Sequence, residues 1–259
     1  MKKIDLTKGK VINVLTVLAL PIMATSLLQF TYNLIDMLWV GALGSDAVAS
    51  VGSSSFFVGL GYAINSMVVI GTTIKLAQAI GRKETEKEKE YINAGLVINL
   101  IIALSYGLLL IFCGKIFIDF LNLNNTIVER NSFYYLAING PILFFGFFKI
   151  IGSYGNNKIA LIISAIGIVS NIILDPIFIY IFNMGVSGAA LATLVANIIM
   201  FLLYRRKSMS FLRYYRGVKL DFVKVKEICV LGIPMSFQRV LFTLINIVLA
   251  RIIGGFGAN

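Results

Sequence analysis

The chain has 259 residues, of which 58% are hydrophobic and only 14% are charged, and its mean hydropathy is +0.89. A soluble domain carries about 25% charged residues, so this composition excludes a soluble domain and indicates a membrane protein. The sequence contains no histidine and only two cysteines, which argues against a transition-metal site, a histidine-based catalytic triad and a disulfide framework.

Taken in chain order, apolar segments separated by charged residues and glycines predict seven membrane-spanning helices, each close to or above the length of about 20 residues that a bilayer requires. The basic start of the chain is interpreted as part of a retained first span, because the apolar stretch that follows is too long for a signal peptide. The alternation that a β-barrel needs is absent. The predicted helices lie at about Val11–Val40, Ala47–Ala79, Tyr91–Cys113, Asn131–Phe148, Ile159–Phe182, Val186–Tyr204 and Glu227–Gly254.

The first predicted helix recurs as the seventh. The residues that recur 213 positions later are Leu18, Pro21, Asn33, Gly41 and Gly44, which correspond to Leu231, Pro234, Asn246, Gly254 and Gly257. Six spans separate the copies, so both point the same way, as in a parallel repeat of six-helix halves. We therefore expect an all-α polytopic membrane protein with three parts: a six-helix amino-terminal lobe (1–204), a basic cytoplasmic linker (205–226) and the first helix of a second lobe (227–259). The rest of a carboxy-terminal lobe is missing, so we expect the chain to be a fragment.

The lysines and arginines predict the orientation of these helices. Of the 23 basic residues, 18 fall in the amino terminus, two loops and the linker, all on one side of the predicted membrane. The positive-inside rule places that side, including the amino terminus, in the cytoplasm, and the protein in the cytoplasmic membrane. Because the net charge of +11 is divided among four segments, it does not indicate nucleic-acid binding. Lys75 and Gln78 are expected to snorkel to the inner surface, and Arg239 has no acidic partner in its own helix.

Two acidic residues, Asp36 and Asp175, lie well inside predicted spans. A charged side chain in a bilayer costs about 2.5–3.5 kcal/mol on insertion scales, so we expect both to face the inside of the bundle. Each belongs to a polar stripe at helical spacing, with Tyr32 near Asp36 and Asn171 near Asp175. Thr193 of the sixth helix lies at a comparable depth.

Two carboxylates, a carboxamide and hydroxyls at one depth suit a hard cation or an exchangeable proton. Pro176 adds the carbonyl of Ile172, which loses its backbone donor. The alternative is that each acid is only a structural hydrogen-bond partner within the bundle. Bending of helices is the role expected of all four prolines, Pro21, Pro141, Pro176 and Pro234.

Four segments resemble the multidrug and toxic compound extrusion (MATE) transporters: YNLID (32–36), GNNKIALIIS (155–164), NIILDP (171–176) and MGVSGAALAT (184–193). The resemblance implies two six-helix lobes around a central cavity, with export of drugs or metabolites driven by inward sodium or proton flow. It assigns a cation site to Tyr32, Asp36, Asn171, Asp175 and Thr193. The sequence departs from the family at the fourth–fifth turn, where Gly152 and Ala160 replace the usual arginine and proline.

We therefore expect a cation-coupled antiporter, not an enzyme, that exports small organic cations or metabolites, with sodium or a proton as coupling ion and no other cofactor. A lipid-linked glycan flippase of the related superfamily would need more cationic residues in the cavity than Lys75 and Arg239. A membrane enzyme acting on lipid lacks a recognisable nucleophile with its base. A non-transporting membrane interaction protein is the third alternative.

The predicted orientation can be tested by cysteine labelling in a variant without native cysteines. Single cysteines replacing Lys87 or Arg213 should be protected from impermeant thiol reagents in intact cells, because both lie on the basic, cytoplasmic side. A cysteine replacing Lys115 should be labelled readily. Equal labelling at all three positions would contradict the orientation.

Overall fold

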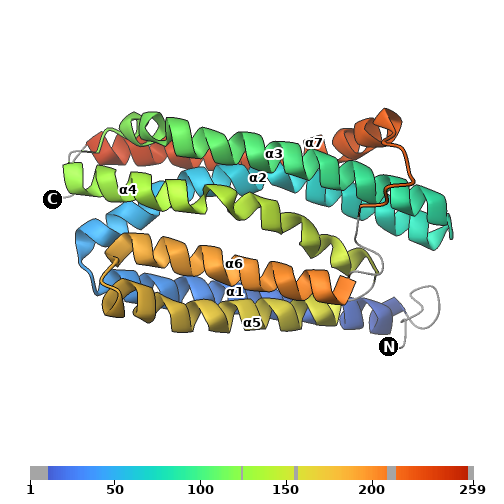
Figure 1. Ribbon diagram of the computed structural model, residues 1–259, viewed down its shortest axis with the longest axis horizontal. Helices are drawn as coiled ribbons and strands as arrows, with labels where there is room; N and C mark the ends of the chain where they lie inside the picture. Colours follow the sequence, from blue (N-terminus) through green and yellow to red (C-terminus); the bar gives the residue numbers. More distant parts are fainter. Residues whose placement is uncertain (1–10, 124, 155–156, 209–213, 256–259) are drawn as a thin grey trace.

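The computed structural model describes residues 11–123, 125–154, 157–208 and 214–255, and over these residues the chain is helical and contains no strand. The basic residues of the amino terminus and Arg213 of the linker lie outside the described residues. The helices run along one long axis and form an elongated bundle (Figure 1). The elements are α1 (Val11–Gly41), α2 (Ser45–Gly81), α3 (Thr85–Phe120), α4 (Thr126–Asn139), η1 (Gly140–Tyr154), α5 (Asn157–Pro176), η2 (Ile177–Ile181), α6 (Gly185–Ser208) and α7 (Phe222–Gly255).

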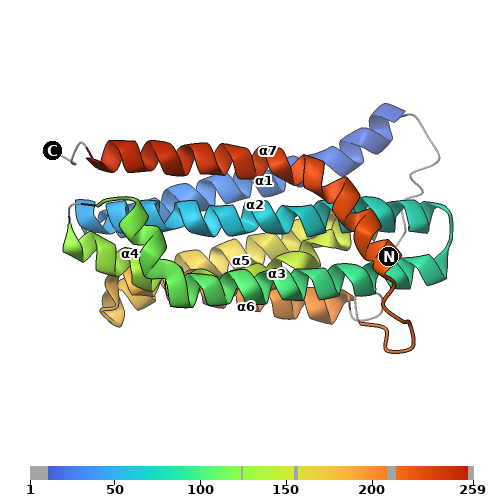
Figure 2. The ribbon, with the colours of Figure 1, turned by 90° about the horizontal axis from the view of Figure 1, so that it is seen from above.

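The bundle has two layers. Helices α1, α5 and α6 lie together in the lower part of Figure 1, and α2, α3, α4 and α7 lie above them. Contacts between α4 and α6 join the two layers. A view from above shows α1 and α7 running in the same direction along the bundle (Figure 2). The two predicted copies of the repeat are therefore parallel.

Successive helices alternate in direction, so the described loops gather at two ends of the bundle (Figures 1 and 2). The end of α2 and the starts of α3, α5 and α7 lie at one end, which we call the basic end. The basic residues described there are Arg82, Lys83, Lys87, Lys89, Lys158, Arg205, Arg206, Arg216, Lys219, Lys224 and Lys226. The opposite end holds the short turns at residues 42–44, 121–123 and 182–184.

Five helices of the described chain are long and apolar enough to cross a membrane: α2, α3, α5 with η2, α6 and α7. The fourth predicted span differs from the expectation, because α4 has only 14 residues and continues as the 3-10 helix η1 from Gly140. Pro141 explains this change, since its ring removes one backbone donor and clashes with the preceding helical turn.

The end of the third span was predicted wrongly, because α3 continues to Phe120 and not merely to Cys113. The segment after Cys113 looks like a loop in sequence, with a glycine and two charged residues among its apolar ones. In the structure Gly114 allows α3 to lie close to α4, and a Cβ there would be 3.3 Å from the Leu136 side chain. Ile118 and Leu121 are each only 1% exposed, so this segment is an amphipathic helix end.

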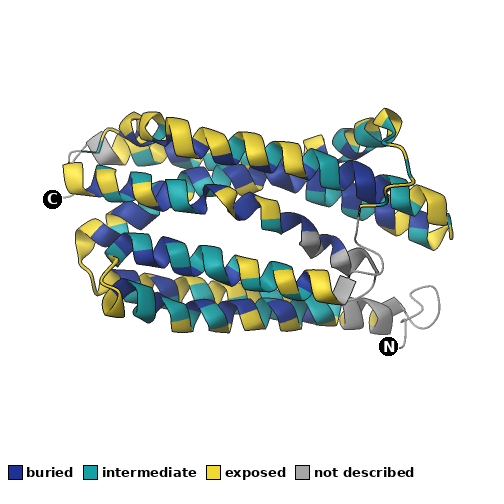
Figure 3. Cartoon of the chain, viewed as in Figure 1, coloured by how far each residue is buried: buried dark blue, intermediate teal, exposed yellow. Residues whose placement is uncertain are grey.

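Residues coloured as buried lie mainly on the faces that the helices turn toward one another, and exposed residues lie mainly on the outward faces (Figure 3). Near the basic end, one apolar cluster joins α2, α3, η1, α5 and α6 through Leu76, Ile92, Phe147, Ile163 and Tyr204. The outward faces are apolar as well, with Met23 69% and Leu27 66% exposed on α1. Large apolar exposed faces are expected of helices that lie against lipid or another membrane domain.

Helix α7 packs along α2. The helix expected to begin the second lobe is therefore in direct contact with the first lobe. The contact depends on two glycines that face the partner's backbone. A Cβ on Gly71 of α2 would collide with the carbonyl oxygen of Ile228, and one on Gly232 of α7 would collide with the carbonyl oxygen of Met67. Small residues permit this close approach of membrane helices.

Replacing either glycine with alanine should therefore destabilise the bundle. We expect Gly71→Ala and Gly232→Ala each to lower the free energy of unfolding by about 1–3 kcal/mol through overpacking, seen as a lower melting temperature of the purified protein. Gly52→Ala and Gly59→Ala are the matched controls, because both are on α2 with open space around the added Cβ. Alanine favours a helix over glycine, so the controls should be neutral or stabilising. Equal effects in all four variants would contradict the close contact.

Candidate cation site

Asp36 and Asp175 meet where α1 packs against α5. The Asp175 side chain is completely buried and Asp36 is 8% exposed. Their carboxyl groups lie within hydrogen-bonding reach of each other. One oxygen of each carboxyl group, Oδ1, is buried and has no hydrogen-bond partner among the described residues. Two adjacent buried carboxylates repel each other, so a cation or proton between them stabilises the pair.

Asn171 connects Asp175 to α6. It lies one helical turn before Asp175 on α5 and is 2% exposed. In the amide orientation that satisfies both of its ends, its Nδ2 donates to Asp175 Oδ2 at 2.9 Å and its Oδ1 accepts from the backbone N–H of Thr193 at 3.1 Å. The amide therefore fixes one carboxylate oxygen and leaves the other available.

Thr193 and Tyr32 complete the group predicted from the sequence. The Thr193 hydroxyl donates to the carbonyl oxygen of Ala189 at 3.0 Å. A hydroxyl has a single proton, so the Tyr32 hydroxyl, 3.4 Å from the Thr193 oxygen, is the donor between these two side chains. The structure thus brings all five predicted site residues together from α1, α5 and α6.

Two local features of the backbone place these residues. After Pro176, α5 widens into the π-helical turn η2, where the N–H of Phe182 bonds to the carbonyl of Ile177 at 2.9 Å. Single π turns are common at functional sites because they redirect a few side chains within a helix. On α6, Gly188 faces the backbone of Phe178, and a Cβ there would be 2.7 Å from its carbonyl oxygen. The small-residue start of α6 therefore permits its close approach to α5 and η2.

Tyr135 of α4 is a further member of the site that the sequence analysis missed. It is 7% exposed, lies close to both carboxyl groups, and its hydroxyl is within hydrogen-bonding reach of Thr193. The sequence does contain a pattern that indicates this face of α4. Ser132, Tyr135 and Asn139 follow the three- and four-residue spacing of one helix face, so they form a polar stripe. The stripe contains no acid, which is why it was overlooked.

Asp36 lies on the wall of a cavity of about 740 Å³ between the two layers. Residues of α1, α2, α4, η1, α5, α6 and α7 line it. Tyr32, Asp36, Asn171 and Thr193 face the cavity, whereas Asp175 is not part of its lining and lies behind them. Arg239 of α7, for which the sequence offered no partner, lines the same cavity.

The ligands that this site offers are all oxygens. They are two carboxylates, the carboxamide of Asn171, and the hydroxyls of Tyr32, Thr193 and Tyr135. Hard cations prefer such oxygen ligands. Within the described chain, no group of three or more histidine, cysteine or acidic side chains gathers in a way that could hold a metal ion.

The apolar helices, with a polar site buried between their layers, define a multi-pass helical membrane protein. The chain belongs to the MATE family of membrane transporters, because the MatE family model matches residues 21–177, more than half of its length.

Relatives agree with this assignment. The probable multidrug resistance protein YpnP of Bacillus subtilis (strain 168) is 27% identical over 285 residues, which cover 100% of this chain and 61% of the relative. The multidrug export protein MepA of Staphylococcus saprophyticus is 29% identical, with 92% of this chain and 55% of the relative covered. A solved structure described as the outward-facing conformation of a multidrug resistance MATE family transporter superposes with a TM-score of 0.82 at 25% identity, covering 93% of this chain and 55% of that one. The chain thus spans 55–61% of the length of these proteins.

Proposed function

We propose that this chain forms the amino-terminal part of a cation-coupled antiporter that exports organic compounds across the cytoplasmic membrane. In this proposal residues 1–204 are a six-helix lobe, 205–226 a cytoplasmic linker and 227–259 the first helix of a second lobe. The multidrug names of the relatives support the substrate class. The gathering of basic residues at one end of the bundle supports a cytoplasmic amino terminus.

The observation that carries the proposal is the buried carboxylate pair, of which Asp36 lines the cavity and Asp175 lies behind it. Asp36 and Asp175 each have a buried oxygen that lacks a partner among the described residues. An acid buried only for structural reasons would have both oxygens satisfied, because an unpartnered buried carboxylate is costly. The two free oxygens therefore favour a site that a sodium ion or a proton occupies in one part of the transport cycle. The hydroxyls of Tyr32 and Thr193 would complete its coordination.

Coupling requires that the ion favours one conformation of the lobe over the other. The arrangement of the site supports this, because the five predicted residues come from three helices, α1, α5 and α6, and Tyr135 comes from a fourth, α4. An ion held between the carboxylates would draw these helices together, and its release would loosen them. Since Asp36 also lines the cavity, a substrate and the ion would compete through the same two conformations.

The alternative of a lipid-linked glycan flippase is less consistent with the cavity. That function needs cationic side chains for the phosphates of its substrate. Among the described residues that line the large cavity, Arg239 is the single basic one. Lys75 lies in a different pocket, at the basic end. Asp36, neutral polar side chains and apolar side chains form the rest of the wall, which suits an organic cation better than a phosphate.

Isosteric neutralisation of the two acids tests the site. In a full-length transporter that contains this lobe, Asp36→Asn and Asp175→Asn should each abolish ethidium efflux driven by an imposed sodium or proton gradient, because the volume is kept and the charge removed. Asn171→Ala and Thr193→Ala should reduce efflux less, since each removes a single neutral ligand.

Asp119→Asn is the matched control, because Asp119 is exposed in the last turn of α3, a helix that contributes no residue to the cation site or to the lining of the large cavity. Expression and membrane insertion should be unchanged in all variants. Gradient-driven efflux that survives in both Asp36→Asn and Asp175→Asn would reduce the pair to structural hydrogen bonding. The gradient that supports efflux in the unmodified protein identifies the coupling ion.

The two-lobe part of the proposal has its own test. Residues 1–259 alone should insert into the membrane but confer no drug resistance, because a single lobe provides only part of the cavity wall. The same residues continued by a second lobe should confer resistance, measured as growth in ethidium or norfloxacin. Resistance from residues 1–259 alone would show that a second lobe is not needed, or that the chain assembles with copies of itself.

A further inference from the structure

A second, smaller pocket lies at the basic end, between the end of α2 and the starts of α3 and α7. Its volume is about 270 Å³. Four of its lining side chains are cationic, Lys75, Arg82, Lys87 and Lys224, and two are acidic, Glu84 and Glu227. The pocket is separate from the large cavity and shares no lining residue with it.

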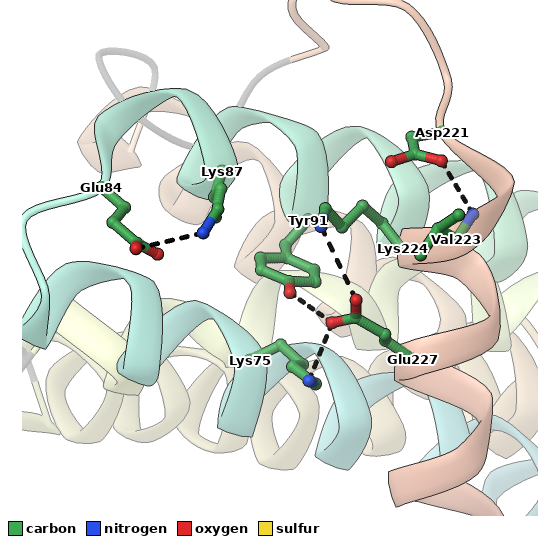
Figure 4. A network of polar contacts seen from close by, with 8 residues as sticks. All are labelled: Lys75, Glu84, Lys87, Tyr91, Asp221, Val223, Lys224 and Glu227. Carbon is green, nitrogen blue, oxygen red and sulfur yellow. Dashed lines mark hydrogen bonds and ion pairs between the residues drawn. The ribbon is translucent and has the colours of Figure 1, made fainter.

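Glu227 is the centre of this pocket and is already fully engaged (Figure 4). Its Oε2 accepts from the Tyr91 hydroxyl at 2.5 Å and from Lys75 Nζ at 2.8 Å. Lys224 Nζ lies 3.6 Å from its other oxygen. Lys75 therefore has a specific partner on α7 and does not simply snorkel to the surface, as the sequence had suggested.

The remaining charges leave the pocket positive. Glu84 is paired with Lys87 at 3.1 Å. Arg82 has no ion-pair partner among the described residues, and Lys224 is held only at the longer distance, with its ammonium 5.3 Å from the centre of the Tyr91 ring. Two acidic side chains cannot neutralise four cationic ones. The pocket thus retains an excess of positive charge that an anion would neutralise.

The neighbouring linker segment is held firmly at the same end. Asn93 of α3 is completely buried and binds it from both ends of its amide. Its Nδ2 donates to the carbonyls of Tyr215 at 2.9 Å and Val218 at 3.1 Å, and its Oδ1 accepts from the Tyr215 N–H at 2.8 Å. This segment carries Arg216 and Lys219, which add positive charge to a fixed surface.

An apolar stripe runs away from the pocket along α7. Val223, Val230 and Phe237 are spaced by seven residues, so they lie on one face, and they are 58%, 59% and 62% exposed. Glu227 lies between the first two along the same helix. A positive pocket at a helix end with an exposed apolar stripe leading from it matches an anionic headgroup joined to hydrocarbon chains.

We propose that this pocket binds the phosphate of an anionic phospholipid from the inner leaflet. The Arg82 guanidinium, whose planar fork suits phosphate oxygens, and the Lys224 ammonium would hold the headgroup, and the acyl chains would lie along Val223, Val230 and Phe237. The bound lipid would tie α7 to the α2–α3 hairpin. The proposal rests on the cytoplasmic assignment of the basic end and is independent of the cation site.

The test measures lipid binding to the purified 259-residue chain by native mass spectrometry and by thermal stabilisation. Phosphatidylglycerol is the anionic probe, phosphatidylcholine the neutral one, and inorganic phosphate the soluble one. We expect phosphatidylglycerol to bind at least tenfold more tightly than phosphatidylcholine. The double variant Arg82→Gln/Lys224→Gln should lose this preference. It should still fold, because Lys75 and Tyr91 remain to satisfy Glu227.

Lys115→Gln/Arg130→Gln is the matched control, since it removes two cations from a pocket at the opposite end. It should keep the preference for phosphatidylglycerol, and so should Asp36→Asn, which affects only the cation site. Equal loss in both double variants would show diffuse attraction to the net charge and would overturn the proposal. Stabilisation by inorganic phosphate equal to that by phosphatidylglycerol would overturn the lipid assignment in favour of a soluble phosphate. Absence of any preference for phosphatidylglycerol in the unmodified chain would also refute it.

Discussion

The placement of two carboxyl groups against each other inside an apolar bundle is the constraint on which the rest of this structure depends. Removing an ion from water costs several kcal/mol even after relaxation, so Asp36 and Asp175 need nearby donors and, in the function proposed above, an exchangeable cation or proton. The bundle meets this need from three directions, with Asn171 below Asp175 and the hydroxyls of Tyr32 and Thr193 beside it. The π turn after Pro176 and the bare backbone at Gly188 follow from the same need, because they bring α5 and α6 into position.

A second arrangement, at the basic end, holds three helices of one layer together, namely α2, α3 and α7. The carboxylate of Glu227 gathers Lys75, Tyr91 and Lys224 from three helices, while Gly71 and Gly232 allow α2 and α7 to touch backbone to backbone nearby. The cation site and this network thus lie at different depths and involve different helices. In the proposed function, an ion binds to and leaves the cation site while the Glu227 network keeps α7 in place.

Much of the site could be predicted from sequence because its residues follow local periodicity. An acid within an apolar span demands a polar face, and the positions one and two turns away supply it, so Tyr32 and Asn171 were identifiable without a structure. Tyr135 was not, since its helix contains no buried acid to direct attention to the stripe. Both ends of α2, which lie next to glycines, were predicted to within about two residues. The start of α3 was predicted at Tyr91 but lies at Thr85, because the charged run before Tyr91 is helical. The end of α3 was misplaced because burial of Ile118 and Leu121 outweighs the loop-like composition around them. The partner of Lys75 could not be inferred either, because Glu227 lies on another helix far along the chain and no local pattern connects them.

The backbone contact between Gly71 and Gly232 also has a consequence for biosynthesis. The two residues are 161 positions apart, and ribosomes add about 5–20 residues per second, so α7 emerges roughly 10 to 30 s after the part of α2 that it covers. During that interval the face of α2 around Gly71 is open to lipid or to the insertion machinery. The packing of α2 is therefore complete only after α7 has been inserted.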